Sequence, residues 1–336
     1  DGTVRFHQYY QDPASRLNTP ATRMVADIGG TNTRLALFDP GLGQLRCVAH
    51  FNNRDHSSLE AIIAEWLDSL PEPIPGEACI AVAAPPATEE ITMINIGWSF
   101  SCNSLAARFG FAQLRCLNDF QANAYALPHL GADDLAPIHD RPPADADGLC
   151  TIGPGTGLGG ATLRRMDGRL AAFAAEPGHM GLSPASEQEL AIFARLLPHY
   201  GNIYAELLLS GSGLVLLYRT LAELDGATPQ PLNPADISQQ GLAGTDPHCA
   251  QALHVFCALL GSACGDFALA NGCYGGLYLA GGIAPRMVSY LRNSDFLHRL
   301  QGKGAMKAHL QAMPVFVITA ENPGLIGAAY APIQAD

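Results

Sequence analysis

The sequence has few basic residues, no unbroken apolar run long enough to cross a membrane, and no two cysteines separated by two residues. Lys and Arg number 19 against 31 Asp and Glu, which gives a net charge of −12. A nucleic-acid-binding surface needs an excess of cationic side chains, so this balance argues against a nucleic-acid partner. The most apolar stretch, residues 259–284, is interrupted by Asp266, Asn271 and glycines, so we expect neither a membrane span nor a membrane partner.

Nine cysteines are spread widely along the chain. Their odd number and their spacing argue against a disulfide framework and against a zinc site. We expect buried free thiols, as in proteins of a reducing compartment. Residues 1–23 are polar and lack the apolar segment of a secretory signal, so we interpret them as an N-terminal extension.

Two similar glycine-rich hairpins are the clearest structural pattern in the sequence. Residues 24–28 and 34–39 read as strands joined by a glycine-rich turn, and residues 149–152 and 161–163 repeat that plan around residues 153–160. With 336 residues and 48% hydrophobic residues, the chain is long and apolar enough for two domains. We therefore interpret the hairpins as a weak internal duplication, one in each of two α/β domains.

The remaining pattern favours parallel strands alternating with helices. Apolar runs ending at proline or at Asn-Asp indicate buried strands, and a Pro- and Asp-rich stretch at 132–148 reads as a surface connection between the halves. Further strands are expected at 45–50, 78–84, 114–119, 276–280 and 315–318, and helices at 58–67, 186–197, 203–222, 249–271 and 323–330. The expected domains are a small one (24–122 with the C-terminal helix, 323–336) and a large one (123–322).

Glycine turns leave backbone N–H groups open to an anion. Each turn also carries a threonine, Thr31 in the first and Thr156 in the second, and neither turn matches a Walker loop or a dinucleotide fingerprint. The pair of turns therefore indicates phosphate binding. Asp27 ends the first strand, where a carboxylate either holds magnesium through water or accepts turn N–H groups.

Polar residues at strand ends and in loops are the candidates for chemistry. Asn118 and Asp119 end an apolar strand, where an aspartate could accept a proton from a hydroxyl that the asparagine holds; a helix N-cap is the alternative. Glu176 and His179 suit a polyhydroxylated ligand, or are ordinary surface residues. Glu206 lies among apolar residues, so it is either paired, ligand-facing or on a solvated helix face.

Taken together, these motifs resemble those of the bacterial-type ATP-dependent glucokinases, over about residues 24–332. The resemblance implies the actin-like (ribonuclease-H-like) ATPase architecture, two α/β domains with ATP and sugar in an interdomain cleft. It also implies a cytoplasmic, glycolytic homodimer that phosphorylates glucose at the 6-hydroxyl. The matching segments are, in chain order, residues 27–32, 117–120, 153–159, 176–179, 209–214, 280–285 and 322–327.

The resemblance also implies a role for individual residues. Asp119 corresponds to the general base on the sugar, and Asp27 to a residue that holds magnesium through water. The sugar ligands implied are Asn95, Asn118, Asp119, Glu176, His179 and Glu206. The ATP-binding residues implied are Asp27, Gly29, Gly30, Thr31, Asn32, Gly155, Thr156, Gly157, Gly281 and Gly282.

Two departures from the family pattern fall in the sugar loop. Pro177-Gly178 stands where Gly-Gly is common, and Gly181 stands where an aspartate is frequent. No CxCG segment follows His179, which argues against the zinc-containing repressor and kinase branch. The alternatives are a kinase for another hexose, such as mannose or an amino sugar, and a non-metabolic actin-like or chaperone-type ATPase.

Overall fold

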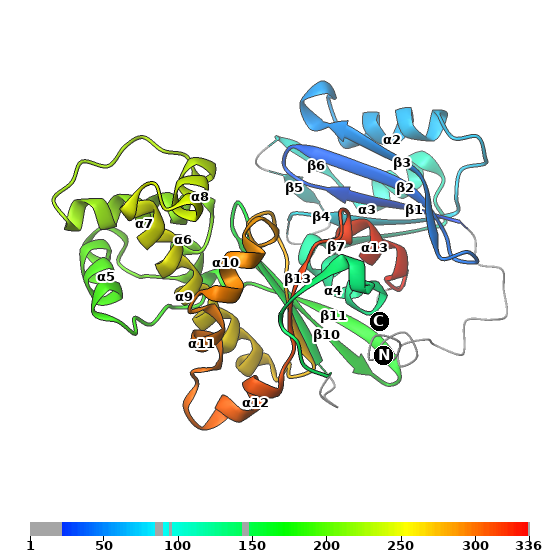
Figure 1. The fold of residues 1–336 in the computed structure, drawn as a ribbon. Coiled ribbons are helices and arrows are strands. Elements are labelled where there is room, and N and C mark those ends of the chain that lie inside the picture. The colour runs from blue at the N-terminus through cyan, green and yellow to red at the C-terminus, as the bar shows by residue number, and fades with distance from the viewer. Residues whose placement is uncertain (1–21, 85–89, 94–95, 143–147, 335–336) are drawn as a thin grey trace. The chain divides into compact units, whose positions relative to one another are not determined.

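The computed structural model describes residues 22–84, 90–93, 96–142 and 148–334. The chain forms two compact units (Figure 1). The first contains the described residues up to Ala132, Met166–Ala174 and the segment from Ala320 onward, and the second contains Asp133–Arg165 and Ala175–Thr319. The first unit thus extends past residue 122, where the sequence placed the boundary.

The first unit is built on a five-stranded sheet of order β3-β2-β1-β4-β7. The first three strands are antiparallel neighbours, and β4 and β7 run parallel to β1. The predicted hairpin and the two predicted parallel strands are therefore present. The strands are β1 (Arg23–Ile28), β2 (Asn32–Asp39), β3 (Gln44–Asn52), β4 (Glu77–Val82) and β7 (Gln113–Asn118), with a separate ribbon of β5 (Ile91–Met93) and β6 (Trp98–Phe100).

Helices cover both faces of this sheet. On one face, α2 (Leu59–Asp68) and α3 (Cys102–Phe109) bury Ile62, Trp66 and Leu105 against the strands. Ser58 caps α2, as expected from the sequence. The other face carries α4 (Asp119–Ala126) and α13 (Pro323–Tyr330), which lie side by side in Figure 1. A Cβ at Gly327 would overlap the carbonyl of Ala122, so only glycine allows α13 to approach α4 this closely.

The six-stranded sheet repeats the strand order of the first sheet. It runs β11-β10-β9-β12-β13, with β8 added beyond β13, and its strands other than β11 lie mainly in the second unit. β9 and β10 form the predicted antiparallel hairpin, and β12 and β13 continue in parallel. The shared order supports the predicted duplication. The strands are β8 (Leu135–His139), β9 (Gly148–Pro154), β10 (Leu158–Met166), β11 (Arg169–Ala175), β12 (Gly276–Leu279) and β13 (Val315–Ile318).

The stretch at 132–148 is not only a surface connection, as the sequence suggested. Residues 135–139 form β8, which pairs with β13 in antiparallel fashion. β8 contains Pro137, which cannot donate to a ladder, and an edge position tolerates that loss. Pro137 in this stretch is therefore explained by the position of β8 at the edge of the sheet.

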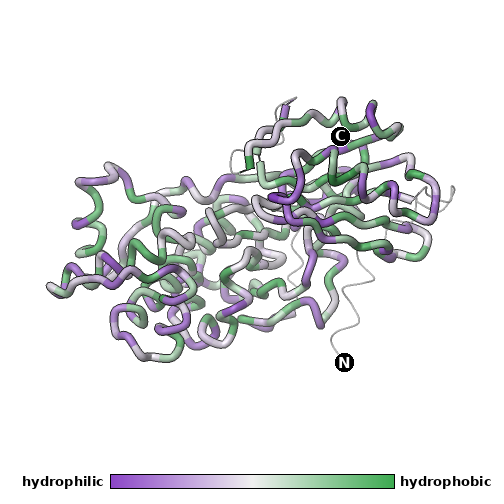
Figure 2. Tube along the Cα trace, turned by 90° about the horizontal axis from the view of Figure 1, so that it is seen from above, coloured by the Kyte–Doolittle hydropathy of each residue, from purple (hydrophilic) through white to green (hydrophobic). Residues whose placement is uncertain are grey.

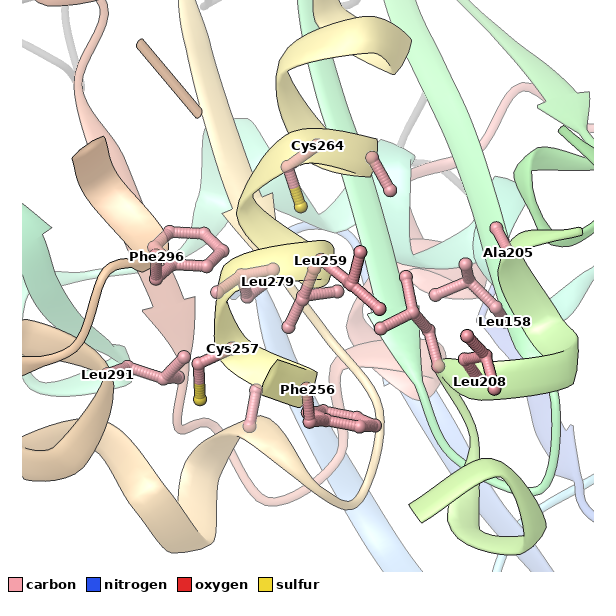
Figure 3. Packing of buried hydrophobic residues seen from close by; sticks show 14 of the residues in the cluster. Leu158, Ala205, Leu208, Phe256, Cys257, Leu259, Cys264, Leu279, Leu291 and Phe296 are labelled. Carbon is pink, nitrogen blue, oxygen red and sulfur yellow. The ribbon is translucent and has the colours of Figure 1, made fainter. Parts of the chain in front are cut away.

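One long helix forms the centre of the second unit. α9 is long and apolar enough to cross a membrane, but 83% of its apolar window is buried among the helices and strands of the protein. Figure 3 shows Phe256, Leu259 and Cys264 of this helix in the core. The predicted helix at 203–222 is two helices, because Ser210 caps the second one at the N–H of Gly213. The α-helices are α5 (Glu187–Tyr200), α6 (Ala205–Leu208), α7 (Gly211–Leu224), α8 (Pro234–Ala243), α9 (Pro247–Asn271), α10 (Val288–Asn293), α11 (Phe296–Gln301) and α12 (Lys307–Ala312).

In Figure 2, hydrophobic and hydrophilic stretches alternate along the chain in both units, as expected where one side of each element faces a core.

Short 3-10 helices connect several of these elements. The 3-10 helices are η2 (Asn53–Asp55), η3 (Leu127–His129), η4 (Ala132–Asp134), η5 (Pro177–His179), η6 (Ala284–Met287) and η7 (Gly304–Met306).

The expectation that all cysteines are free is wrong for one pair. Cys102 at the start of α3 and Cys116 in β7 form a disulfide, with their Cα atoms 6.5 Å apart. The fold brings them together because α3 leads directly back into β7, which spacing along the sequence does not reveal. Among the described residues, six other cysteines are buried free thiols and Cys47 is exposed. No group of metal-ligating side chains occurs in that part of the chain.

Candidate functional site

The first glycine turn, residues 29–32, follows β1 and is held by a buried asparagine. Asn53, only 3% exposed, donates through Nδ2 to the Gly29 carbonyl at 2.8 Å. Its Oδ1 accepts from the Thr33 hydroxyl at 2.8 Å, and its backbone N–H donates to Thr31 at 2.9 Å. Three contacts from one residue fix the turn in place. No local pattern points to Asn53, because its partners are two backbone groups and the Thr33 hydroxyl, all about twenty residues away.

Asp27 lies in β1 directly opposite Arg34 of β2. The Arg34 guanidinium is 3.4 Å from Oδ2 of Asp27. A Cβ at Gly324 would lie 2.8 Å from the Asp27 carboxyl carbon, so the first turn of α13 packs against the carboxylate. Burial raises the pKa of Asp27 above its usual value, while Arg34 opposes the shift. One fifth of the side chain stays accessible, so a ligand can reach it.

Asn118 and Asp119 lie where β7 ends and α4 begins. The Asn118 side chain accepts from the N–H groups of Phe120 at 3.0 Å and Gln121 at 3.3 Å, so Asn118 is the N-cap of α4. Oδ1 of Asp119 also accepts from the Phe120 N–H, at 2.9 Å. The capping interpretation is therefore confirmed for Asn118. These bonds fix the backbone from which the Asp119 carboxylate projects.

The glycine turn and Asp119 share one edge of the first sheet. Ile28, Val82 and Asn118 are in register across the parallel strands β1, β4 and β7. Adjacent strands are about 4.8 Å apart, so the ends of β1 and β7 are separated by roughly 10 Å. In parallel sheets this carboxyl edge is where ligands bind. Within the first unit, the fold therefore brings the predicted phosphate turn and the predicted base together.

The second glycine turn, at the end of β9, is stabilised by backbone hydrogen bonds. The Gly155 N–H donates to Gly157 at 2.8 Å, and Gly211 donates to the Gly155 carbonyl at 2.9 Å. Gly281 has φ +82°, and a Cβ there would lie 2.5 Å from the Pro154 carbonyl. Ile152 and Leu279 are in register, so Gly281 and Gly282 follow β12 at the same sheet edge. The second unit thus places two of the predicted nucleotide segments together.

Glu206, at the start of α6, is half-buried and bonded to the second turn. Its Oε2 accepts from the Leu158 N–H at 2.8 Å. A Cβ at Gly157 would overlap Oε2, and one at Gly178 would come within 3.1 Å of it. Figure 3 shows the Leu158 side chain in the core near Ala205 and Leu208, which anchors both ends of this contact. Glu206 is therefore paired, not merely on a solvated helix face.

Glu176 precedes η5 and His179 is its last residue, and both are exposed. The chain after η5 pairs with the segment leading into α6, because Ala205 N–H donates to the Met180 carbonyl at 2.8 Å. Glu176, His179 and Glu206 therefore belong to one loop cluster. Asn95 lies outside the described residues.

Comparisons with known proteins identify the family. The glucokinase family model matches residues 24–335. The chain belongs to the glucokinase family. A glucokinase of Klebsiella pneumoniae (strain 342) is 38% identical over 304 residues, covering 90% of this chain and 94% of the relative. A glucokinase of Chromobacterium violaceum is 40% identical over 307 residues, covering 91% of this chain and 88% of the relative.

A solved glucokinase structure from an Antarctic psychrotroph matches with a TM-score of 0.85 and 36% identity. The match covers 92% of this chain and 98% of that one. It confirms the expected fold class, a two-domain α/β protein of actin-like ATPase type. Within the glucokinase family, the alternative of a non-metabolic ATPase loses its support.

A magnesium ion is compatible with the side chains at the first turn. Mg²⁺ commonly binds through one or two carboxylates and through substrate phosphates and water. Asp27 offers one accessible carboxylate beside the residue 29–32 turn, whose backbone is open to phosphate. The oxygen donor and its position both suit a hydrated divalent ion.

Proposed function

We propose that this chain transfers the terminal phosphoryl group of ATP to the 6-hydroxyl of D-glucose, giving glucose 6-phosphate. Membership in the glucokinase family supports the reaction and the substrates. The observation that carries the assignment of residues is the position of Asp119 at the carboxyl edge of the first sheet, shared with the residue 29–32 turn.

Asp119 is proposed as the general base. Its carboxylate would accept the proton of the sugar hydroxyl as the oxygen attacks phosphorus. The Phe120 N–H at Oδ1 and the Asn118 cap hold the backbone in place, so the group is oriented before substrate arrives. Proton transfer to a positioned carboxylate is typically worth ~10²–10⁴-fold in rate.

The sugar ligands are proposed as Asn118, Glu176, His179 and Glu206, together with Asn95 and Asp119. Carboxylate oxygens accept from sugar hydroxyls, and an imidazole either donates or accepts. Loss of such a partner leaves a buried polar group unsatisfied, which gives strong discrimination among sugars. Glu206 is already oriented by the Leu158 N–H, so its second oxygen can address a hydroxyl.

The two glycine turns are proposed to hold the phosphates of ATP through backbone N–H groups. The residues concerned are Gly29, Gly30, Thr31, Asn32, Gly155, Thr156 and Gly157, with Gly281 and Gly282 on the adenosine side. Gly29 and Gly155 already donate their own N–H groups within the turns, to the carbonyls of Asn32 and Gly157, so these two residues would shape the turns for the ligand. Magnesium, held by Asp27 through water, would neutralise charge on the transferring phosphoryl group. Both turns are rigidly braced, so their N–H groups need little reorganisation on binding.

A coupled assay for ADP with a panel of hexoses tests the reaction. We expect glucose to be the best acceptor with ATP; higher kcat/KM for mannose or an amino sugar would favour the alternative hexose kinase. That alternative draws support from Pro177 and Gly181, which depart from the family pattern beside His179. ATP hydrolysis without sugar dependence would contradict both.

Asp119→Asn tests the base. We expect kcat to fall at least ~10²-fold while glucose still binds. Asp68→Asn, at the exposed end of α2, is the matched control and should leave kcat unchanged. Near-normal turnover in the Asp119 variant would remove this residue from the role.

A homodimer, a cytoplasmic location and a place in glycolysis follow from the family resemblance and are part of this proposal. Sedimentation equilibrium at micromolar concentration tests the first point. We expect twice the mass of the 35.4 kDa chain. A single species at the monomer mass would contradict it.

A further inference from the structure

The loop that carries His179 is paired with the segment that carries Glu206. Gly181 and Tyr204 form an antiparallel bridge. The Leu182 N–H donates to Ile203 at 3.0 Å, and the Ala205 N–H donates to Met180 at 2.8 Å. Hydrogen bonds on both sides of the bridge fix the backbone of Tyr204 relative to the His179 loop.

The side chain of Tyr204 contacts the imidazole of His179. The ring centroids are 5.8 Å apart, with an angle of 53° between the planes. This spacing lies within the range of favourable aromatic pairs. Tyr204 is half-buried whereas His179 is exposed, so the phenol is the better-anchored partner. The tyrosine ring therefore supports the histidine ring, and not the reverse.

An exposed imidazole with two free torsions loses conformational entropy when a ligand immobilises it. Immobilising a side chain on binding costs about 2- to 12-fold in affinity. A ring already held against Tyr204 has lost part of that freedom before the sugar arrives. Tyr204 is also two residues before Glu206, on the same braced segment.

We propose that Tyr204 is a positioning residue of the sugar site, which orients the His179 imidazole toward a sugar hydroxyl. The proposal rests on the proposed function, since it gives His179 a sugar ligand's role. Tyr204 itself makes no contact with the substrate, so its aromatic ring matters and its hydroxyl does not.

Steady-state kinetics of Tyr204→Leu and Tyr204→Phe test the proposal. We expect Tyr204→Leu to raise KM for glucose roughly 2- to 12-fold with kcat and KM for ATP unchanged. Tyr204→Phe should retain the wild-type KM. Tyr200→Leu, at the exposed end of α5, is the matched control. An unchanged KM in Tyr204→Leu overturns the proposal, and a Phe variant as impaired as Leu shows that the hydroxyl acts directly.

A double-mutant cycle with His179→Ala separates positioning from general damage. If Tyr204 acts through His179, then Tyr204→Leu adds nothing in the His179→Ala background. An undiminished effect there contradicts the proposal.

An NMR measurement does not depend on turnover. The His179 imidazole resonance, assigned with His179→Ala, should shift in Tyr204→Leu as the ring current is lost. An unshifted resonance overturns the ring contact and the proposal with it. If Tyr204→Leu shifts the resonance but the wild-type protein does not phosphorylate glucose, the ring contact holds and it is the proposed function that has failed.

Discussion

The N–H of Leu158 donates to Oε2 of Glu206 at 2.8 Å, so the second glycine turn and the proposed sugar ligand are one structural unit. Gly157, the preceding residue, leaves no space for a side chain beside that oxygen. A substitution in the turn should therefore change KM for glucose.

Gly157→Ala should displace the Glu206 carboxylate and break its bond to Leu158. Leaving a polar group without its partner costs about 1–3 kcal/mol, so we expect KM for glucose to rise about 10-fold. Gly76→Ala is the matched control, because a methyl group there meets nothing within 4 Å. Equal effects of the two substitutions would contradict the link between turn and sugar ligand.

Asn53→Ala should loosen the first glycine turn. The variant loses side-chain bonds to Gly29 and Thr33, both of 2.8 Å. We expect the free energy of unfolding to fall by about 2–3 kcal/mol and KM for ATP to rise. Urea denaturation and initial rates measure the two effects. The neighbouring exposed Asn52→Ala should change both far less; a comparable loss there would show that the brace is not specific.

Asp27→Asn should reduce activity without reducing stability. Burial raises the pKa of Asp27 above 3.8, so the native state holds this proton more tightly than the unfolded chain. Ionisation of Asp27 therefore lowers the free energy of unfolding at pH values above its raised pKa. We expect the variant to be at least as stable as wild type at pH 7, while ATP-dependent turnover falls at least about 10-fold.

The pH dependence of this difference is a second test of Asp27. The advantage of the variant should shrink as the pH falls through the raised pKa toward 3.8, where wild type regains its proton. Urea denaturation at several pH values follows it. A variant less stable than wild type at pH 7 would show that the Arg34 ion pair outweighs the burial cost.

The Cys102–Cys116 disulfide should stabilise the first unit. It closes a loop with a sequence separation of 14, and loops of this size give about 3 kcal/mol in the chain-entropy description. We expect the Cys102→Ser/Cys116→Ser protein to be less stable by about that amount, and insensitive to reductant. Cys47→Ser, at an exposed free thiol, should keep the sensitivity of wild type. A wild type that reductant does not destabilise would contradict a stabilising bond.

Local signals in the sequence sufficed for the elements that carry the site. The glycine turns after β1 and β9 and the apolar strands β4 and β7 were predicted, because each combines an apolar run with a turn residue, and the N-cap at Asn118 was one of the two alternatives for that position. The single helix expected at 203–222 was wrong, since Ser210 and the glycines after it end α6 and cap α7, a break that the apolar residues on both sides obscured.

What the sequence did not reveal depends on residues distant in the chain. Asn53 holds a turn more than twenty residues earlier, and the disulfide of Cys116 joins strand β7 to Cys102 at the start of helix α3. Neither shows a local pattern. Burial cost made pairing one of the alternatives for Glu206, but its partner, the backbone of Leu158, could not be inferred.

The approach of Gly327 to Ala122 has a consequence for synthesis. α13 packs on α4 and against Asp27, yet about two hundred residues separate it from α4 along the chain. A ribosome must translate Asp133–Arg165 and Ala175–Thr319 before this helix emerges. Because domains fold as units during synthesis, the first unit cannot complete its packing until this helix emerges, and the face of the nascent N-terminal sheet that carries α4 waits only partly covered. Chaperones that shield apolar surface would meet that face.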